Sequence, residues 1–179
     1  MGTQAVISGS FRKHLDEIGI ALEAFREAGI EVLAPATKDA VNSAASFVLL
    51  STDDSKKSAD VLEKEFMSKI EKIDFLYVAN VGGYVGKSVA AEMSFASIHH
   101  IPIVMAEEIN QFSEEISLSA QTILKTSAIA YLPIDSINSF RVADLNLQSS
   151  VPRGLSLEQK ANLNSLIDNL LEELKHVKI

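Results

Sequence analysis

Cysteine is absent from this chain of 179 residues. Without thiols the protein can form neither a disulfide framework nor a thiolate metal site. Its four histidines are scattered, apart from the neighbours His99 and His100, and their positions do not match the spacing of metal ligands. We therefore expect neither a metal nor another cofactor.

Basic side chains are in the minority: 16 lysines and arginines stand against 24 acidic residues, which gives a net charge of -8. A charge of this sign opposes broad contact with the backbone of DNA or RNA, so we expect no nucleic acid polymer as a partner. A single phosphate needs only a few backbone N–H groups and one arginine. A small nucleotide is therefore compatible with the composition.

Long apolar runs are absent as well. No apolar segment approaches the roughly 18 residues of a membrane-spanning helix, so we expect no membrane partner. The N-terminus enters an apolar stretch at residues 4–8 without the charged region and cleavage site of a signal peptide. These features favour a cytoplasmic protein. The length favours one domain over residues 1–179, and many aliphatic with few aromatic residues favour the α/β class.

Apolar runs alternate with helical periodicities along the chain, which is typical of an α/β fold. The first 35 residues contain a β-α-β unit, whose helix ends at Gly29, and such a unit implies parallel strands. We expect strands at residues 4–8, 31–34, 75–79, 101–105 and, at an edge, 128–132. We expect helices at residues 14–28, 59–73, from 89 onward, 113–125 and 156–177.

Two segments are less regular. Residues 46–50 form a further apolar run, and the polar stretch after it has the composition of a loop. Residues 126–155 have no clear period apart from the edge strand. The last helix begins with capping-box spacing at Ser156 and Gln159 and carries a leucine-rich stripe, which covers either the sheet or a second subunit.

The most informative segment is 74–96. A continuous apolar run at 75–79 predicts a strand buried on both faces of a parallel sheet. Gly82, Gly83 and Gly86 then allow a tight turn, and Ser88 can cap the helix that follows. Because open α/β sheets bind ligands beyond the carboxyl ends of their strands, near helix N-termini, we expect a ligand site here.

A second turn, at residues 8–12, follows the first strand and is expected on the same rim of the sheet. Gly9, Ser10 and Arg12 in this turn, together with the glycine turn at 82–88, can make a pocket for an anion. The alternative is that both turns are ordinary strand-to-helix connections, which also favour glycine and serine.

Glu92 is the candidate reactive group. It follows Ser88 by four residues, so both side chains share one helix face, and the helix dipole is expected to stabilise its anion. An ionised glutamate beside a pocket suits a nucleophile or a base. The alternative is a surface glutamate that only complements the dipole. Tyr84 either stacks on a ring of the ligand or merely covers the loop.

Together these motifs resemble the nucleoside 2-deoxyribosyltransferase-like superfamily, which includes the deoxynucleoside 5′-monophosphate N-glycosidases. The resemblance covers roughly residues 1–107 and is carried by the motifs at 8–12, 74–80, 82–88 and 92–96. It implies a flavodoxin-like or Rossmann-like three-layer α/β sandwich with a mostly parallel five-stranded sheet, assembled as a homodimer or higher homo-oligomer.

The resemblance also implies site residues. Glu92 would attack the anomeric carbon of a nucleoside or nucleotide and trap the sugar covalently, as in retaining glycosidases. Asp74 matches a strand-opening aspartate of structural role. Substrate binding falls to Gly9, Ser10, Phe11, Arg12, Asn80, Tyr84, Gly86 and Ser88.

The chain departs from the superfamily pattern at two positions. The second catalytic carboxylate, an aspartate about two helical turns before the strand aspartate, is replaced by Phe66, so the neighbouring Glu65 becomes the candidate and would need a shifted helix to reach the site. Gly86 stands where the transferases carry an aspartate. We therefore expect cleavage or transfer of an N-glycosidic bond, with hydrolysis favoured.

Two other functions stay open. A nucleotide-binding sensor without turnover is compatible with the missing aspartate. A phosphoribohydrolase of the lysine-decarboxylase-like type also pairs a Gly-Gly loop with a glutamate, but its fuller proline-glycine-glycine and threonine signature is absent from the sequence.

Overall fold

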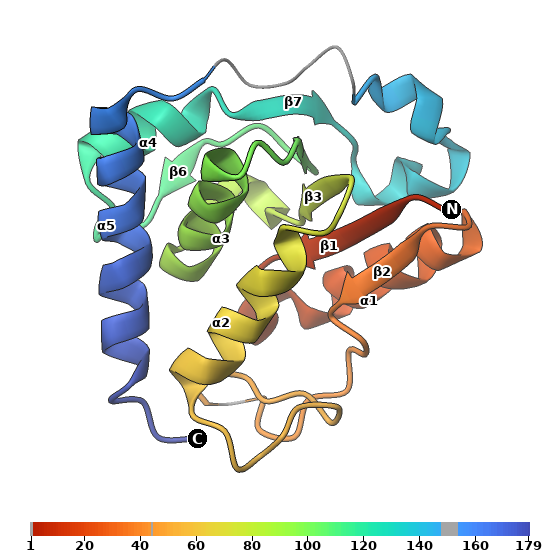
Figure 1. The fold of residues 1–179 in the computed structure, drawn as a ribbon. Coiled ribbons are helices and arrows are strands. Elements are labelled where there is room, and N and C mark those ends of the chain that lie inside the picture. Colours follow the sequence, from red (N-terminus) through yellow and green to blue (C-terminus); the bar gives the residue numbers. More distant parts are fainter. Residues whose placement is uncertain (1, 44, 148–153) are drawn as a thin grey trace.

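The computed structural model describes residues 2–43, 45–147 and 154–179. Its centre is a five-stranded sheet in the order β2-β1-β3-β5-β7, and all neighbouring strands are parallel (Figure 1). Numbered within the sheet alone, this order is 2-1-3-4-5, which is the flavodoxin-like arrangement. The predicted α/β class and parallel five-stranded sheet are therefore confirmed. The strands are β1 (Gln4–Ser8), β2 (Glu31–Ala34), β3 (Phe75–Val78), β5 (Ile103–Met105) and β7 (Ala128–Tyr131).

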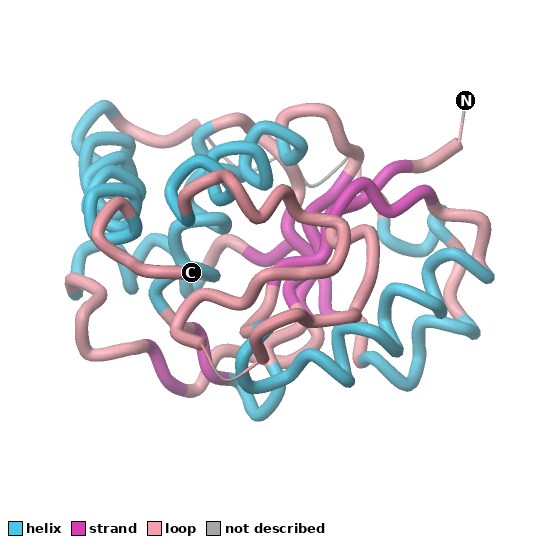
Figure 2. Tube along the Cα trace, turned by 90° about the horizontal axis from the view of Figure 1, so that it is seen from below, coloured by secondary structure: helices cyan, strands magenta, loops and turns pink. Residues whose placement is uncertain are grey.

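Helices flank both faces of this sheet (Figure 2). One face packs on α1 (Phe11–Glu27) and on two short 3-10 helices, η2 (Ile134–Ser139) and η3 (Val142–Leu145). The other face packs on α2 (Ala59–Ile70) and α3 (Lys87–Ile98). The last helix, α5 (Leu157–Leu174), packs against α3, α2 and α4 (Leu118–Lys125). Among the described residues, no helix combines the length and the apolar character needed to cross a membrane.

The central strand β3 is buried on both faces, as its apolar run predicts. Leu76 and Val78 point into the core beneath α3, whereas Phe75 and Tyr77 point into the core beneath α1. All four side chains are fully buried. The Phe25 ring packs edge-to-face on Phe75 and Tyr77, which fixes α1 on its side of the sheet.

Several boundaries differ from those expected. α1 begins at Phe11 rather than at 14, because Ser10 accepts a hydrogen bond from the backbone N–H of Lys13 and so caps the helix. His14 has non-helical dihedrals within it. α2 ends at Ile70 rather than at 73. The capping box of Ser156 and Gln159 at α5 is confirmed.

Other differences concern segments without a long period. α4 begins at Leu118, since β6 (Gln111–Phe112) pairs with β4 (Tyr84–Val85) and occupies the preceding chain. The apolar run at 46–50 forms no strand: Leu50 makes one isolated bridge to Ala40. Within residues 126–155 the structure adds η2 and η3 to the predicted edge strand, and residues 148–153 lie outside the described part.

The glycine turn after β3 is held by side chains from the loop after β5. Gly82 and Gly83 both have positive φ, at 72° and 75°. The Gly82 N–H donates to the Glu107 carboxylate at 2.8 Å, and the Asn110 amide donates to the Gly82 carbonyl at 2.7 Å. A Cβ at Gly83 would lie 2.6 Å from the Glu108 carbonyl oxygen, so position 83 has no room for a side chain.

A substitution pair tests this constraint. Gly83→Ala should lower the free energy of unfolding by about 2 to 4 kcal/mol, because it adds a backbone clash to the strain of a positive φ. Gly82→Ala shares the backbone strain but meets nothing within 4 Å, so it should cost only about 1 kcal/mol. Urea unfolding of both variants measures the difference, and equal losses would show that the close contact is unimportant.

Candidate active site

A cavity of about 490 Å³ opens at the carboxyl end of β1. Its walls come from the turn after β1, the loop after β2, α2, the glycine turn and the first turn of α3. β1 and β3 are the strands between which the sheet order reverses, and open α/β sheets bind ligands at this switch point. The volume lies within the range of roughly 300 to 1,000 Å³ that is usual for small-molecule sites.

Glu92 lies in the wall of this cavity and is only 6% exposed. It occupies the second turn of α3, and its carboxylate accepts a hydrogen bond from the hydroxyl of Ser8, the last residue of β1. Ser8 is fully buried, so its hydroxyl has a fixed position. The end of a strand and the start of a helix thus hold one carboxyl group between them.

A second buried carboxyl, that of Glu63 on α2, lies beside Glu92. Glu63 is also 6% exposed and lines the same cavity. The two carboxyl groups are within hydrogen-bonding reach of each other, which requires a proton on one of them because two carboxylates are both acceptors. In the described part of the chain, no donor reaches Glu63 Oε1, although this atom is buried.

Burial raises the pKa of both groups. For Glu92 the loss of solvent raises the pKa well above its ordinary value, the charge of Glu63 and the hydrogen bond with Glu63 raise it further, and only the Ser8 hydrogen bond lowers it. For Glu63, burial raises the pKa and the hydrogen bond with Glu92 opposes the shift. The helix dipole acts mainly on the first turn of a helix and Glu92 lies in the second, so the Ser8 hydroxyl, rather than the dipole, is the group that favours the charged form of Glu92.

Most of the predicted site residues meet at this cavity. The turn after β1 and the glycine turn line it together, and they contribute Gly9, Ser10, Phe11, Arg12, Tyr84, Gly86 and Ser88. The rings of Phe11 and Phe66 pack edge-to-face at 6.2 Å between centroids, and form part of its apolar lining.

Three predicted residues lie elsewhere or differently. Asn80 is outside the cavity lining, and its amide pairs with the backbone of Glu107, which joins the ends of β3 and β5. Asp74 precedes β3 at the opposite end, where its carboxylate accepts the N–H of Gln4 at 2.7 Å. Glu65 lines the cavity, but its side chain is 46% exposed and forms an ion pair with Lys57 at 2.5 Å.

Ser88 does not cap α3. Gly86 occupies the N-cap, and in the described structure no side chain bonds the first N–H groups of the helix. Gly86, Lys87, Ser88 and Val89 all line the cavity, so the unpaired N–H groups at this helix start are close to any bound ligand. A helix start of this kind favours an anion.

Basic side chains gather at the cavity although the protein is acidic. Its lining includes Arg12, Lys13, Lys57, Lys69 and Lys87. Lys87 pairs with Glu173 of α5, and the Lys13 ammonium lies 4.8 Å from the centre of the Tyr84 ring. Within the described ranges, Arg12 and Lys69 have no acidic side chain at ion-pair distance.

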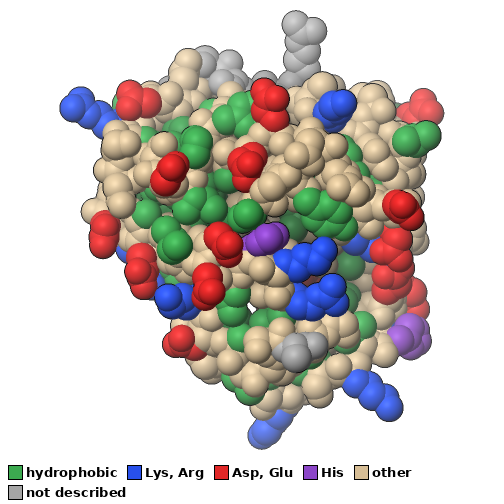
Figure 3. Space-filling model, turned by 180° about the vertical axis from the view of Figure 1, so that it is seen from behind, with side chains coloured by type: hydrophobic (Ala, Val, Ile, Leu, Met, Phe, Trp, Pro, Cys, Tyr) green, Lys and Arg blue, Asp and Glu red, His purple; other side chains and the backbone are tan. Residues whose placement is uncertain are grey.

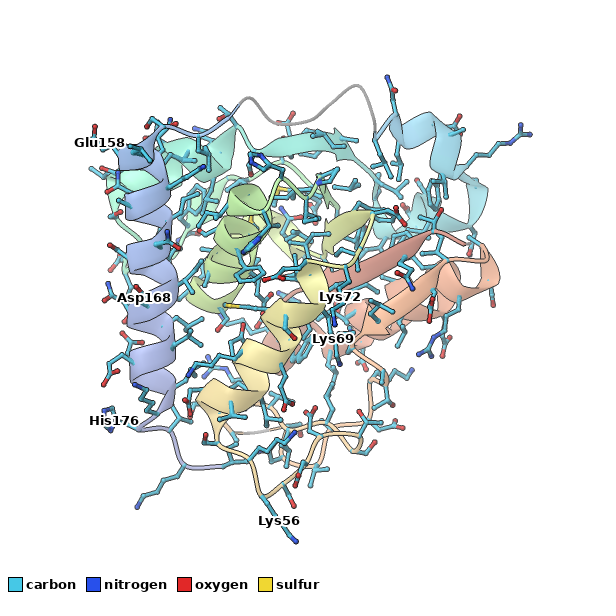
Figure 4. The ribbon with its side chains drawn as sticks, in the orientation of Figure 1. Lys56, Lys69, Lys72, Glu158, Asp168 and His176 are labelled. Atoms are coloured by element: carbon cyan, nitrogen blue, oxygen red, sulfur yellow. The ribbon has the colours of Figure 1, made fainter. Side chains whose placement is uncertain are left out.

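Figure 4 shows Lys69 on the C-terminal half of α2, and Lys56 at the outer end of the loop before α2, pointing away from the molecule. On the face shown in Figure 3, acidic side chains are dispersed, whereas basic side chains form a group near the middle. The cavity lining holds five basic and five acidic side chains, whereas acidic residues outnumber basic ones in the whole chain. The basic side chains of the lining can bind a ligand that carries negative charge.

Two residues of the site, Ser8 and Glu63, were not predicted from the sequence. Ser8 belongs to the motif at 8–12 but had no assigned role, because the strand pattern alone does not show which side chain faces Glu92. Glu63 had a detectable signal: Ala59 and Met67, four residues to either side, are apolar and buried, so Glu63 stands on a buried helix face. A charged residue at such a position indicates a functional or paired group.

Metal binding has no obvious place in the described residues, where no group of three or more His, Cys, Asp or Glu side chains could hold an ion. No protein-family model matches the chain. No curated protein matches it either.

The solved structures that are similar to this fold include that of the 2-deoxyribosyltransferase of the psychrotolerant bacterium Bacillus psychrosaccharolyticus. The match covers 80% of this chain and 96% of that one, with 14% sequence identity and a TM-score of 0.47. The sequence motifs resemble the superfamily that bears the name of this type of enzyme. A likeness this distant does not bear on substrate or reaction, which depend on the site itself.

The pH dependence of the stability of a Glu63 variant tests whether the pKa values of the two carboxyl groups are raised in the folded protein. A carboxyl whose pKa is raised in the folded state contributes stability below its ordinary pKa, and this contribution is lost as the pH rises through the folded-state value. Glu63→Gln should therefore be more stable than the wild type at pH 8, by about 1 to 3 kcal/mol, and the difference should shrink toward pH 4.

Urea unfolding at several pH values measures this effect. Glu23→Gln, at an exposed position of α1, is the control and should show no pH-dependent difference from the wild type. A Glu63→Gln variant that is less stable than the wild type at pH 8 would contradict the burial of an uncompensated carboxyl pair.

Proposed function

We propose that this chain cleaves the N-glycosidic bond of a nucleoside or nucleoside 5′-monophosphate, with Glu92 as the nucleophile. The observation that carries the proposal is the position of Glu92: a buried carboxyl in the wall of a cavity of about 490 Å³, held by the Ser8 hydroxyl and surrounded by aromatic and basic side chains. A carboxylate in such a place is equipped to stabilise positive charge that develops on a sugar.

The reaction follows the double displacement of retaining glycosidases. The ionised Glu92 attacks C1′ of the sugar, the bond from C1′ to the base nitrogen breaks, and the sugar is held as an ester. Water then attacks C1′ and releases the sugar. The Ser8 hydrogen bond supports this role, because a donor at the carboxylate favours the charged form that attacks.

The lining of the cavity matches the parts of a nucleotide. Phe11, Phe66 and Tyr84 provide aromatic faces for a base or sugar ring. The basic side chains and the uncapped start of α3 provide sites for a phosphate. We propose water rather than a second base as the acceptor, because Gly86 offers no side chain to hold another base.

Three further expectations of the sequence belong to this proposal. They are a location in the cytoplasm, assembly as a homodimer or higher homo-oligomer, and a single domain over residues 1–179. None of them changes the chemistry of the site. Size-exclusion chromatography with light scattering measures the oligomeric state directly.

Glu92→Gln is the direct test of the nucleophile. The substitution keeps the size of the side chain and its contact with Ser8 but removes the negative charge, so base release from a panel of nucleosides and nucleotides should fall by at least about a thousandfold. Chromatography of the free base measures release, and a thermal melt checks that the variant folds.

The same panel separates an enzyme from a sensor. A wild-type protein that is stabilised by a nucleotide but releases no base would be a nucleotide-binding protein without turnover. Full activity of Glu92→Gln would exclude the proposed mechanism, whatever the wild type does.

Removal of positive charge from the cavity tests whether the basic side chains bind the phosphate of a nucleotide. Arg12→Ala and Lys69→Ala should each raise the KM for nucleoside 5′-monophosphates about tenfold and leave the KM for the corresponding nucleosides nearly unchanged, because only the phosphate gains from the cations. Lys56→Ala, at an exposed position outside the cavity lining, is the matched control. Equal effects on nucleosides and nucleotides would show that these cations do not contact a phosphate.

A further inference from the structure

We propose that Glu63 is the second catalytic carboxyl of this site and delivers the proton that the departing base requires. The inference rests on the proposed function, because it assigns a donor for the bond that Glu92 breaks. It differs from the assignment by sequence, which selected Glu65. The two candidates are on the same helix, α2, two residues apart.

The hydrogen bonds of the site distinguish the two buried carboxyls. Glu92 accepts a hydrogen bond from the hydroxyl of Ser8, so a negative charge on the Glu92 carboxylate has a donor. Glu63 Oε1 is buried and has no donor within the residues that the structure describes, so a negative charge on Glu63 would be uncompensated. The raised pKa of Glu92 alone would leave the shared proton on Glu92, but the hydrogen bonds favour the other arrangement, because only Glu92 has a donor for its charge. In that arrangement Glu63 holds the proton and Glu92 carries the charge.

Position favours Glu63 over Glu65 as well. Glu63 is 6% exposed and adjacent to Glu92, on the cavity wall where the glycosidic bond must lie for attack. The Glu65 side chain is 46% exposed and occupied by its ion pair with Lys57. An acid must reach the base nitrogen while Glu92 reaches C1′, and these two atoms are bonded to each other. Only a carboxyl close to Glu92 meets that condition.

The proton and electron balance of the reaction closes with these two groups. As the Glu92 oxygen bonds to C1′, the electron pair of the C1′–N bond passes to the base nitrogen, which takes the proton of Glu63. Glu63 is then a carboxylate beside a neutral ester. In the second step it accepts a proton from the attacking water, the C1′–O bond to Glu92 breaks, and the starting protonation of the pair is restored.

Substrates that need no acid provide the test. The base of an ordinary purine nucleotide leaves well only when it is protonated, whereas N7-methylguanine already carries a positive charge in the nucleotide and leaves as a neutral molecule. For pyrimidines, 5-fluorouracil is a better leaving group than uracil. The experiment compares kcat/KM for guanine with N7-methylguanine nucleotides, and for uracil with 5-fluorouracil nucleotides, after subtraction of the rate without enzyme.

Glu63→Gln should lower kcat/KM for the ordinary nucleotides by about a hundredfold to ten-thousandfold and that for the N7-methylguanine nucleotide by less than about tenfold. Retained activity on the methylated substrate also shows that the variant folds. Glu92→Gln should lower kcat/KM for both classes of substrate to the same extent. Glu23→Gln serves as the exposed control and should match the wild type.

The outcomes separate the two proposals. Equal losses on both substrates in Glu63→Gln, or a selective loss in Glu65→Gln instead, would overturn the role of Glu63 while leaving the nucleophile intact. Full activity of Glu92→Gln would overturn the proposed function. A wild-type protein that releases no base from any of these nucleotides would overturn both.

Discussion

The site depends on the burial of two carboxyl groups next to each other with a single hydroxyl as donor. A buried carboxylate without hydrogen bonds or a counter-charge is costly, and two in contact also repel. Glu63 and Glu92 avoid this cost only if one of them keeps a proton, and Ser8 favours the charge on Glu92. A charged group and a neutral acid therefore coexist side by side, as acid-assisted displacement requires.

The parallel sheet brings these groups together from distant parts of the chain. Ser8 ends β1, Glu63 lies on the helix that leads into β3, and Glu92 lies on the helix that follows β3. Because β1 and β3 are neighbours and end at the same edge, the three side chains meet there. The helices α2 and α3 cover the same face of the sheet, and between them each of the two glutamates is only 6% exposed.

Local patterns predicted much of this fold. The apolar run of β3 and the capping box of α5 are local signals, and both are in place. The two-residue strands β4 and β6 are too short for a period. In the run at 46–50, Val48, Leu49 and Leu50 are buried, but they lie in a loop that forms no regular strand. Glu63 was missed because its role arises from a contact with α3, and the signal for it was one acidic residue on an apolar helix face.

The pairing of Lys87 with Glu173 links the mouth of the cavity to the last helix of the chain. Lys87 is the first residue of α3, and its ammonium is directed to α5 as long as Glu173 holds it. A negatively charged ligand at the start of α3 would compete with Glu173 for the same cation. A ligand that takes Lys87 from Glu173 would remove one contact between α3 and the C-terminal helix, and an anchored Glu173 would weaken binding of that ligand to the same extent.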